Sequence, residues 1–134
     1  MKVFLDTSVV ASAFVARGPC ELLMRHILAV HEPFTSQDVL DELQWFLIDR
    51  VHLPPTTVQG IFALLWELPV MMRPPVPTPV RGADPDEEWV LAPAFLAEAD
   101  VFLTLDKGLL KLNGKTRMRI LDPQAFRRLV RKAA

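Results

Sequence analysis

The sequence predicts an α/β fold with a mainly parallel central sheet. Short apolar runs typical of strands alternate with segments whose apolar residues recur at helical spacing, which favours strand–helix–strand units. Acidic residues directly follow two of the short runs, where ligands bind in sheets of this kind. The 134 residues show neither an internal repeat nor a low-complexity tract, so we expect one domain over residues 1–134.

The elements are expected in the order strand, two helices, strand, two helices, strand, helix, strand, short helix, strand and helix. Strands are expected at residues 2–5, 31–34, 70–72, 101–105 and 118–121. Helices are expected at residues 9–15, 22–27, 35–50, 56–65, 84–98 and 123–132. Residues 108–110 are expected to form a short turn or helix.

Breaking and capping residues set the boundaries in the first half of the chain. Gly18-Pro19 is expected to end the first helix. Thr35 and Asp38 have the T-x-x-D spacing of a capping box, so the third helix is expected to start there. Pro54-Pro55 interrupts the chain, and either of the two threonines that follow can cap the fourth helix.

The boundaries in the second half rest on prolines and acids. Residues 74–82 hold four prolines in nine positions, which indicates a stiff connection with room for an edge strand. Asp84 followed by a proline and by Glu87 three residues later is a strong helix start. Pro93 is expected to kink that helix or end it early, and Asp122 is expected to cap the last helix.

The composition is that of a water-soluble globular protein, with 51% hydrophobic and 23% charged residues. No apolar run approaches the roughly 20 residues of a membrane span, and an acid at position 6 comes too early for a signal peptide. The single cysteine, Cys20, excludes an internal disulfide and a site built from several thiolates. We therefore expect a cytoplasmic protein that does not enter a membrane.

The net charge of −1 conceals an uneven distribution of charge along the chain. Residues 32–106 hold thirteen acids and three bases, whereas residues 107–134 hold nine bases and one acid. Such a division is expected when one region collects cations and another faces a polyanion. The alternative for the basic region, taken by itself, is a solvated helix face.

Four separate segments bring carboxylates toward one edge of the expected sheet. Asp6 and Asp106 stand at strand ends, while Asp41-Glu42 and the acids of residues 84–88 lie early in helices that open on the same edge. Carboxylates that converge in a cleft repel one another, so we expect a cation there. Because these segments contain neither His nor Cys, Mg²⁺ or Mn²⁺ is favoured over zinc, and a water on such an ion can attack a phosphodiester.

Each acid also has a structural alternative. Asp6 can cap the helix that follows it, and Asp106 can cap the turn at Gly108. Glu42 can lie on the solvated face of an amphipathic helix, and Glu87 can close a capping box. The hydroxyls beside the acids, on Thr7, Ser8 and Thr104, can orient a water or a phosphate oxygen, or they can be turn and cap groups.

Aromatic and basic side chains are the residue types that commonly contact a nucleic acid. The three tryptophans stand at helical positions, which predicts core or interface rather than base stacking; they are Trp45, Trp66 and Trp89. Five bases soon after Asp106 are candidates to follow an RNA backbone, because phosphate contacts supply most nonspecific affinity; they are Lys107, Lys111, Lys115, Arg117 and Arg119.

At these residues the sequence resembles the PIN-domain family, in particular its VapC-like toxin ribonucleases. Residues 3–10, V-F-L-D-T-S-V-V, resemble the family's first strand with its D-T-N/S end, and residues 36–42 resemble the segment of its second acid. Residues 84–88, D-P-D-E-E, resemble its D-P-D-D-D helix start, and residues 99–106, A-D-V-F-L-T-L-D, resemble its segment ending in T-G-D. The four segments occur in the family's order over nearly the whole chain.

The resemblance implies a three-layer α/β/α PIN fold and an endoribonuclease that uses Mg²⁺ or Mn²⁺. Carried over by position, the metal ligands would be Asp6, Glu42, Glu87 and Asp106, and Thr104 would support the site. A homodimer and a partner antitoxin that blocks the cleft are also implied.

The sequence departs from the family's pattern at two places. The third acid is Glu87 where the family usually has Asp, so Glu88 or Asp86 is an alternative ligand. Leu105 replaces the glycine of T-G-D, and Gly108 stands where an acid is common.

Three interpretations other than a toxin ribonuclease are compatible with parts of this pattern. One is a PIN nuclease that processes RNA as housekeeping, and another is a PIN-like module that binds RNA or protein without cutting. The third is a phosphatase or receiver domain, which also carries acids at strand ends. The phosphatase D-x-D motif would need an acid where Ser8 stands, and the acid pair and lysine of a receiver were not found.

Overall fold

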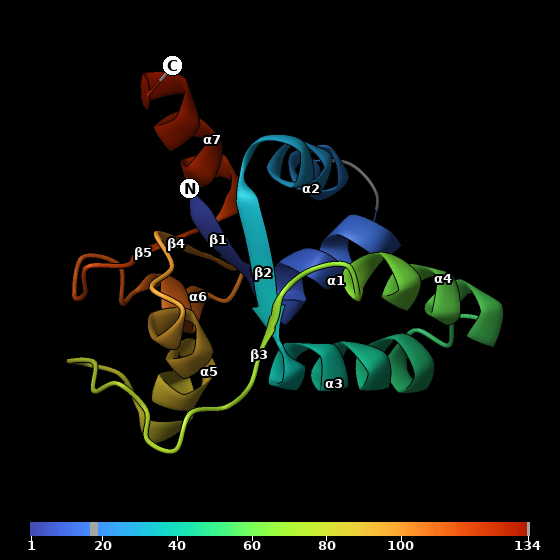
Figure 1. The fold of residues 1–134 in the computed structure, drawn as a ribbon, viewed down its shortest axis with the longest axis horizontal. Helices are drawn as coiled ribbons and strands as arrows, with labels where there is room; N and C mark the ends of the chain where they lie inside the picture. The colour runs from blue at the N-terminus through green and yellow to red at the C-terminus, as the bar shows by residue number, and fades with distance from the viewer. Residues whose placement is uncertain (17–18, 134) are drawn as a thin grey trace.

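The computed structural model describes residues 1–16 and 19–133, and in them five strands form one fully parallel sheet (Figure 1). The strand order is β3-β2-β1-β4-β5. The strands are β1 (Lys2–Leu5), β2 (Glu32–Ser36), β3 (Val70–Met71), β4 (Val101–Leu103) and β5 (Arg119–Leu121). The chain adds β2 and β3 on one side of β1 and then β4 and β5 on the other. The point where the winding reverses, which is where such sheets bind ligands, therefore lies between β1 and β4.

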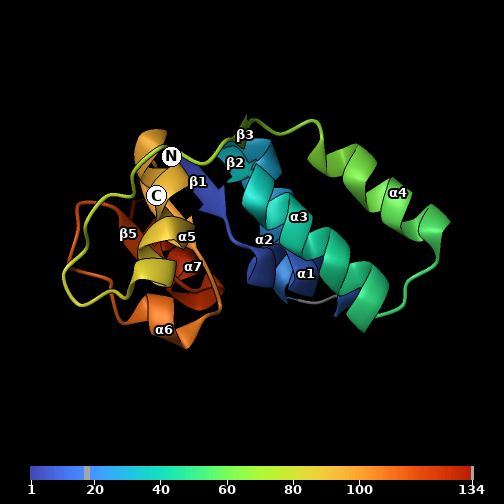
Figure 2. The same ribbon diagram turned by 90° about the horizontal axis from the view of Figure 1, so that it is seen from below.

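Helices connect the strands and cover both faces of the sheet (Figures 1 and 2). They are α1 (Thr7–Val15), α2 (Pro19–Val30), α3 (Gln37–Trp45), α4 (Pro55–Leu65), α5 (Pro85–Leu96), α6 (Lys107–Leu110) and α7 (Pro123–Ala133). A π-helical turn, η1 (Phe46–Arg50), extends α3. No helix in the described part of the chain is long and apolar enough to cross a membrane.

Alternating side chains of the central strand divide the core between the two faces. Val3 and Leu5 pack into one cluster with residues of α1, α2, α3, α4 and α7. Phe4 points to the opposite face, where it packs with residues of α5 and α6. There it stacks on Phe102 of β4 at 4.9 Å between ring centroids and meets Phe34 of β2 edge-on at 5.4 Å. The expected three-layer α/β/α arrangement with a parallel sheet is thus confirmed.

The structure corrects the expected start of two helices. Ser36, one residue after Thr35, caps α3, and its hydroxyl accepts the N–H of Val39 at 3.1 Å. Since β2 extends through Ser36, the hydroxyl of Thr35 stays in the sheet and donates to the carbonyl of Leu5. The next helix, α4, begins at Pro55 after Pro54 and has no side-chain cap, so the two threonines were wrongly expected to cap it.

Other boundaries shift by a few residues. The first helix starts at Thr7 rather than residue 9, and its expected break at Gly18 lies outside the described residues. The expected edge strand in residues 74–82 is not formed, since the N–H of Val80 donates to Glu88 instead of a strand. Helix α5 continues through Pro93 and ends at Leu96, two residues earlier than expected.

Candidate functional site

The two acids at the strand ends lie next to each other because β1 and β4 are paired. Asp6 directly follows β1, and its N–H donates to the carbonyl of Leu103, the last residue of β4. Asp106 follows three residues after Leu103. Figure 2 views the molecule from the side of these strand ends, with α5 and α6 on one side of β1 and α3 on the other. Segments from four parts of the sequence therefore meet at one edge of the sheet.

Asp6 is a buried carboxylate held by two hydroxyls. It is 8% exposed, and its Oδ2 accepts hydrogen bonds from the hydroxyls of Thr104 at 2.7 Å and Ser8 at 3.0 Å. It makes no side-chain capping bond to α1, so the capping alternative for Asp6 is not what the structure has. The Asp6 carboxylate is thereby fixed in orientation at the floor of the site.

Thr104 and Ser8 also fix the chain that leads to the second acid. The fully buried hydroxyl of Thr104 accepts the N–H of Asp106 at 3.0 Å, and the hydroxyl of Ser8 accepts the N–H of Leu105 at 3.0 Å. These bonds turn the chain away from the sheet after Leu103, which explains why β4 is two residues shorter than expected. The two hydroxyls are therefore turn groups, as one alternative had it, and they also hold Asp6. The other alternative, that they orient a water or a phosphate oxygen, stays a prediction.

Glu42 enters the site from α3. It is an exposed residue, and its Oε2 accepts a hydrogen bond from the hydroxyl of buried Thr7 at 3.2 Å. Since α1 starts at Thr7, this bond links the helix after β1 to the helix after β2. Glu42 thus faces the same edge as Asp6 rather than only solvent.

Asp106 and Glu87 approach each other across Gly108. A Cβ atom built on Gly108 would lie 3.0 Å from Oε2 of Glu87 and 3.1 Å from Oδ1 of Asp106. Both carboxylates also have the structural roles considered as alternatives. Asp106 caps α6 by accepting the N–H groups of Gly108 and Leu109 at 2.8 and 3.3 Å, and Glu87 closes the capping box with Asp84. The absence of a side chain at position 108 is what leaves room for the two acids.

The other two acids considered in place of Glu87 have different surroundings. Glu88 turns away, because its Oε2 accepts the N–H of Val80 at 2.8 Å and so holds the proline-rich segment. Asp86 is exposed and lines a hollow together with Asp6 and Glu42. Glu87 lines neither this hollow nor the hollow that Asp106 lines, and it comes near the other acids only through its approach to Asp106 across Gly108.

The acids line two neighbouring hollows, together called the carboxylate cleft here. The Trp45 hollow has a volume of about 550 Å³ and is lined by residues that include Asp6, Glu42, Asp106 and Trp45. The Trp89 hollow has a volume of about 290 Å³ and is lined by residues that include Asp6, Glu42, Arg73 and Trp89. Since Asp6 and Glu42 belong to both, the two hollows meet at these acids.

The carboxylates of the cleft destabilise one another in the ionised form. Burial raises the pKa of Asp6, and the charge of Asp106 raises it further, while hydrogen bonds from Thr104, Ser8 and the Thr7 N–H lower it. Partial loss of water also raises the pKa of Glu42, as do the charges of Asp6 and Asp106, and the Thr7 hydroxyl opposes the rise. Because like charges contribute to the raised pKa of both Asp6 and Glu42, a cation bound beside them would be favoured.

The donor set of the cleft fits a hard divalent cation. All the charged donors are carboxylate oxygens, which Mg²⁺ and Mn²⁺ prefer. Among the described residues, however, no group of three acids, histidines or cysteines is close enough to hold an ion directly. Mg²⁺ commonly keeps several waters and takes only one or two carboxylates, so its binding would not require a group of three.

Several cleft residues were missed or misjudged from the sequence. Trp45, 53% exposed, lines its hollow, and half-buried Trp89 lines the other, so neither is a core residue, while the expected alternative of an interface stays a prediction. Trp66 is 57% exposed and lies outside the cleft. Arg73 also lines the cleft, yet it lies in a proline-rich connection without a motif. The five bases proposed to follow RNA are all exposed, but none of them lines either hollow.

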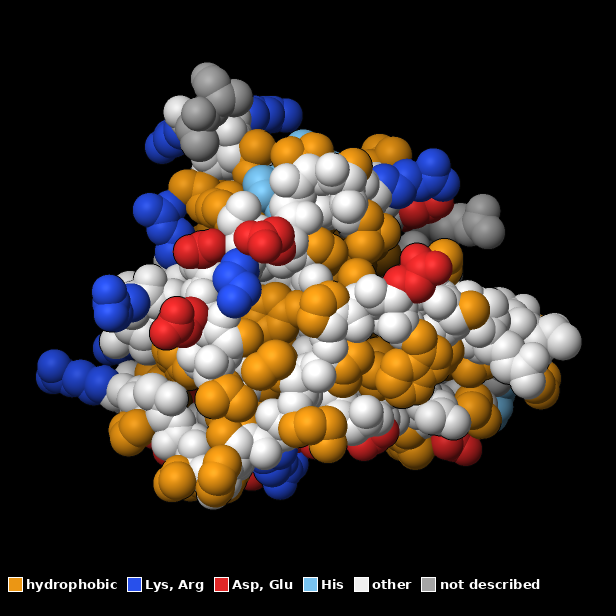
Figure 3. All heavy atoms as spheres, viewed as in Figure 1, with side chains coloured by type: hydrophobic (Ala, Val, Ile, Leu, Met, Phe, Trp, Pro, Cys, Tyr) orange, Lys and Arg blue, Asp and Glu red, His pale blue; other side chains and the backbone are white. Residues whose placement is uncertain are grey.

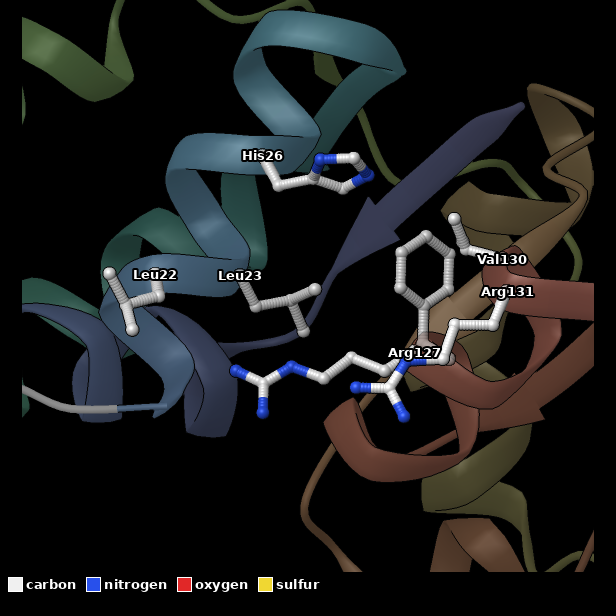
Figure 4. Close-up of a pocket in the computed structure, with 7 residues that line it drawn as sticks. Leu22, Leu23, His26, Arg127, Val130 and Arg131 are labelled. Atoms are coloured by element: carbon white, nitrogen blue, oxygen red, sulfur yellow. The ribbon is translucent and has the colours of Figure 1, made fainter. Parts of the chain in front are cut away.

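A third hollow, of about 370 Å³, lies between α2 and α7 and contains no carboxylate (Figure 4). Figure 4 shows Arg127 and Arg131 reaching from α7 toward α2, beside Leu23 and below His26. It shares no lining residue with the carboxylate cleft.

The fold is similar to that of a chain in a solved structure of VapBC2 from Rickettsia felis, bound to a DNA fragment from the promoter of its components. The TM-score is 0.66, the match covers 91% of this chain and 98% of that chain, and 10% of the residues are identical. No protein-family model matches the sequence, and no curated protein matches it. The likeness shows that this chain has the same fold as a chain of that structure, in keeping with the α/β/α fold that the sequence motifs predicted.

Proposed function

We propose that this protein is an endoribonuclease that cleaves RNA phosphodiester bonds with Mg²⁺ or Mn²⁺ in the carboxylate cleft. The observation that carries the proposal is the meeting of Asp6, Glu42 and Asp106, three acids from separate elements, in one hollow beside the switch point of a parallel sheet. The raised pKa values of Asp6 and Glu42 support it, because a cation would relieve the repulsion that contributes to them. The VapC-like fold supports a nuclease as well.

The residues of the cleft would act mainly by positioning. Of Asp6, Glu42 and Asp106, one or two would bind the ion directly and the others would bind it through its waters. Glu87, which approaches Asp106, would be a fourth acid nearby. Once bound, the ion would polarise the phosphate and activate a water for attack. Thr104 and Ser8 hold Asp6 in place, and Thr7 does the same for Glu42, so little reorganisation is needed when substrate arrives. No histidine lines the cleft among the described residues, so we assign no separate general base.

Incubation of a mixed-sequence single-stranded RNA with Mg²⁺ or Mn²⁺ tests the proposal. We expect cleavage by the wild type, its loss in EDTA, and a drop of about 100-fold or more in Asp6→Asn. Asp49→Asn is the matched control, because Asp49 is exposed and lines neither hollow. Equal background in all samples of folded protein would contradict the nuclease and favour the alternative, a PIN-like module that binds RNA or protein without cutting.

We further propose a role as the toxin of a toxin–antitoxin pair, acting in the cytoplasm. The similarity to a chain of the VapBC2 complex supports this role over the housekeeping alternative. Expression should arrest growth, Asp6→Asn should not, and co-expression of a small protein encoded directly upstream should relieve the arrest. Cleavage in vitro without any growth arrest would favour housekeeping processing instead.

We also propose the homodimer that the resemblance implies. Figure 3 shows hydrophobic side chains spread over the face that carries α4 and the segment after β3. Leu64, Trp66, Met72 and Val76 are each between 57% and 73% exposed, and a contact between two copies over this face would bury them. Sedimentation velocity should give twice the mass of the chain, and a monomer at all concentrations would contradict this assembly.

A further inference from the structure

Arg73, which follows β3, is held over Trp89 of α5 by an acid of α3. Its Nε donates to Oδ2 of Asp38 at 3.0 Å, and its guanidinium carbon lies 5.1 Å from the centroid of the Trp89 ring. Three elements that are distant in the sequence thus fix one guanidinium group. A surface arginine fixed in this way loses less side-chain entropy when it binds a ligand than a free one would.

The guanidinium keeps its terminal nitrogens available. The group has five N–H donors, and Asp38 uses only the one on Nε. Within the described residues, neither Nη nitrogen of Arg73 has a hydrogen-bond partner, and the side chain is 57% exposed. The pair of Nη groups is the part of arginine that binds a phosphate.

The free Nη groups of Arg73 belong to a side chain that lies beside the acids of the cleft. Arg73 lines the Trp89 hollow together with Asp6 and Glu42, the acids that also line the Trp45 hollow. Among the described residues that line the two hollows, Arg73 is the only base. A polyanionic strand that reaches the acids therefore finds one cation on the walls of the cleft, and Asp38 holds it there.

The same hollow also offers an apolar wall. The half-buried indole of Trp89 lines it, together with Val90 and Pro93 from the same helix. Because the Arg73 guanidinium lies over the indole, a base that is not paired or stacked in a duplex would meet the two planar groups together, and such stacking tolerates any sequence.

We propose that Arg73 and Trp89 form a subsite for single-stranded RNA next to the scissile phosphate. The Nη groups of Arg73 bind a neighbouring phosphate, and the indole of Trp89 contacts an unpaired base of the same strand. This inference rests on the proposed ribonuclease function and specifies how that site takes its substrate. Single-stranded RNA is preferred over duplex RNA, because a paired base cannot reach the indole.

Fluorescence anisotropy with a labelled single-stranded RNA in EDTA, where no metal-dependent cleavage occurs, tests the subsite. Arg73→Ala should weaken binding about tenfold and reduce the slope of log affinity against log salt by about 0.7, which is the loss of one phosphate contact. Arg73→Lys should restore the salt slope but not the full affinity, because lysine keeps the charge but lacks the two N–H groups with which a guanidinium binds a phosphate. Trp89→Leu should weaken binding of the single strand but not of the same RNA as a duplex.

The matched control is Arg25→Ala. Arg25 is likewise an exposed arginine paired with an acid, Glu21, but it lies on α2 away from the cleft. Affinity and salt slope in Arg73→Ala equal to those in Arg25→Ala would overturn the subsite. If instead the wild type never cleaves RNA but the Arg73 effect on binding persists, the subsite stands and the nuclease proposal fails. With an active enzyme, Arg73→Ala should raise KM about tenfold while kcat changes less than about threefold.

Discussion

The hydroxyl of Thr104 donates a 2.7 Å hydrogen bond to the carboxylate of Asp6, joining side chains 98 positions apart in the sequence. The bond forms because β1 and β4 are neighbours, so the residues after them emerge side by side. The same hydroxyl accepts the N–H of Asp106. One buried oxygen thus sets the relation between the two acids that follow the central strands.

Replacing Thr104 tests this relation. Thr104→Val keeps the shape but leaves the Asp6 carboxylate and the Asp106 N–H short of a partner, so the free energy of unfolding should fall by about 1–3 kcal/mol. Thr104→Ser keeps the hydroxyl and should recover most of that loss. Denaturant unfolding in EDTA measures both, and equal stability of the Val variant and the wild type would show that the bond contributes little.

The raised pKa of Asp6 predicts that this acid costs stability when no cation is bound. Because the pKa of Asp6 is higher in the folded than in the unfolded chain, protonation of Asp6 favours the folded state. This contribution to the free energy of unfolding is fully present below the pKa of the unfolded chain. It is lost as the pH rises through the folded pKa. In EDTA at pH 7, Asp6→Asn should therefore melt at a higher temperature than the wild type, with a smaller difference at acid pH. Asp49→Asn should show no such gain; a lower melting temperature for Asp6→Asn at pH 7 would contradict the assignment.

The absence of a side chain at Gly108 predicts a variant that loses activity while its fold is kept. In Gly108→Ala the new Cβ would press on the carboxylates of Glu87 and Asp106, and we expect cleavage to fall about tenfold while the helix α6 is retained. Gly60→Ala is the control, because Gly60 lies in α4 with nothing within 4 Å of its Cβ position. That change should raise stability by about 0.5–1 kcal/mol without affecting cleavage. Full activity of Gly108→Ala would show that the Glu87–Asp106 approach is unimportant.

The bond from Thr7 to Glu42 predicts a shift in the pH profile of cleavage. The hydroxyl lowers the pKa of Glu42, so Thr7→Val should raise this pKa and move the acid limb of kcat/KM to higher pH. Thr57→Val, at an exposed position of α4, should leave the limb in place. The pH dependence of kcat/KM from pH 5 to 8 measures the effect, and an unmoved limb in Thr7→Val would mean that Glu42 does not limit activity there.

The parts of the fold and site that follow from local pattern were predictable. Asp6 is visible because a strand of four residues and the acid directly after it form one continuous motif, and Asp106 ends a similar motif although β4 itself stops at Leu103. The capping box of Asp84 and Glu87 is equally local. A resemblance in the order of such motifs was enough to predict the three-layer fold.

The walls of the cleft were not predictable in the same way. Arg73 and Trp89 meet because β3 and α5 both pack against β2, and neither residue carries a sequence signal for that contact. The role of Gly108 depends on where two side chains from other turns end, which a motif does not encode. Thr35 and Ser36 are both good helix caps, so the choice between them rests on how far β2 extends.

Binding of Mn²⁺ in the absence of RNA, followed by electron paramagnetic resonance, tests most directly whether the acids of the cleft hold an ion. The wild type and Asp49→Asn should bind Mn²⁺ with the same affinity, and Asp6→Asn and Glu42→Gln should each weaken it at least about tenfold. Equal binding by all four folded proteins, or no binding by the wild type, would contradict a metal site at Asp6 and Glu42.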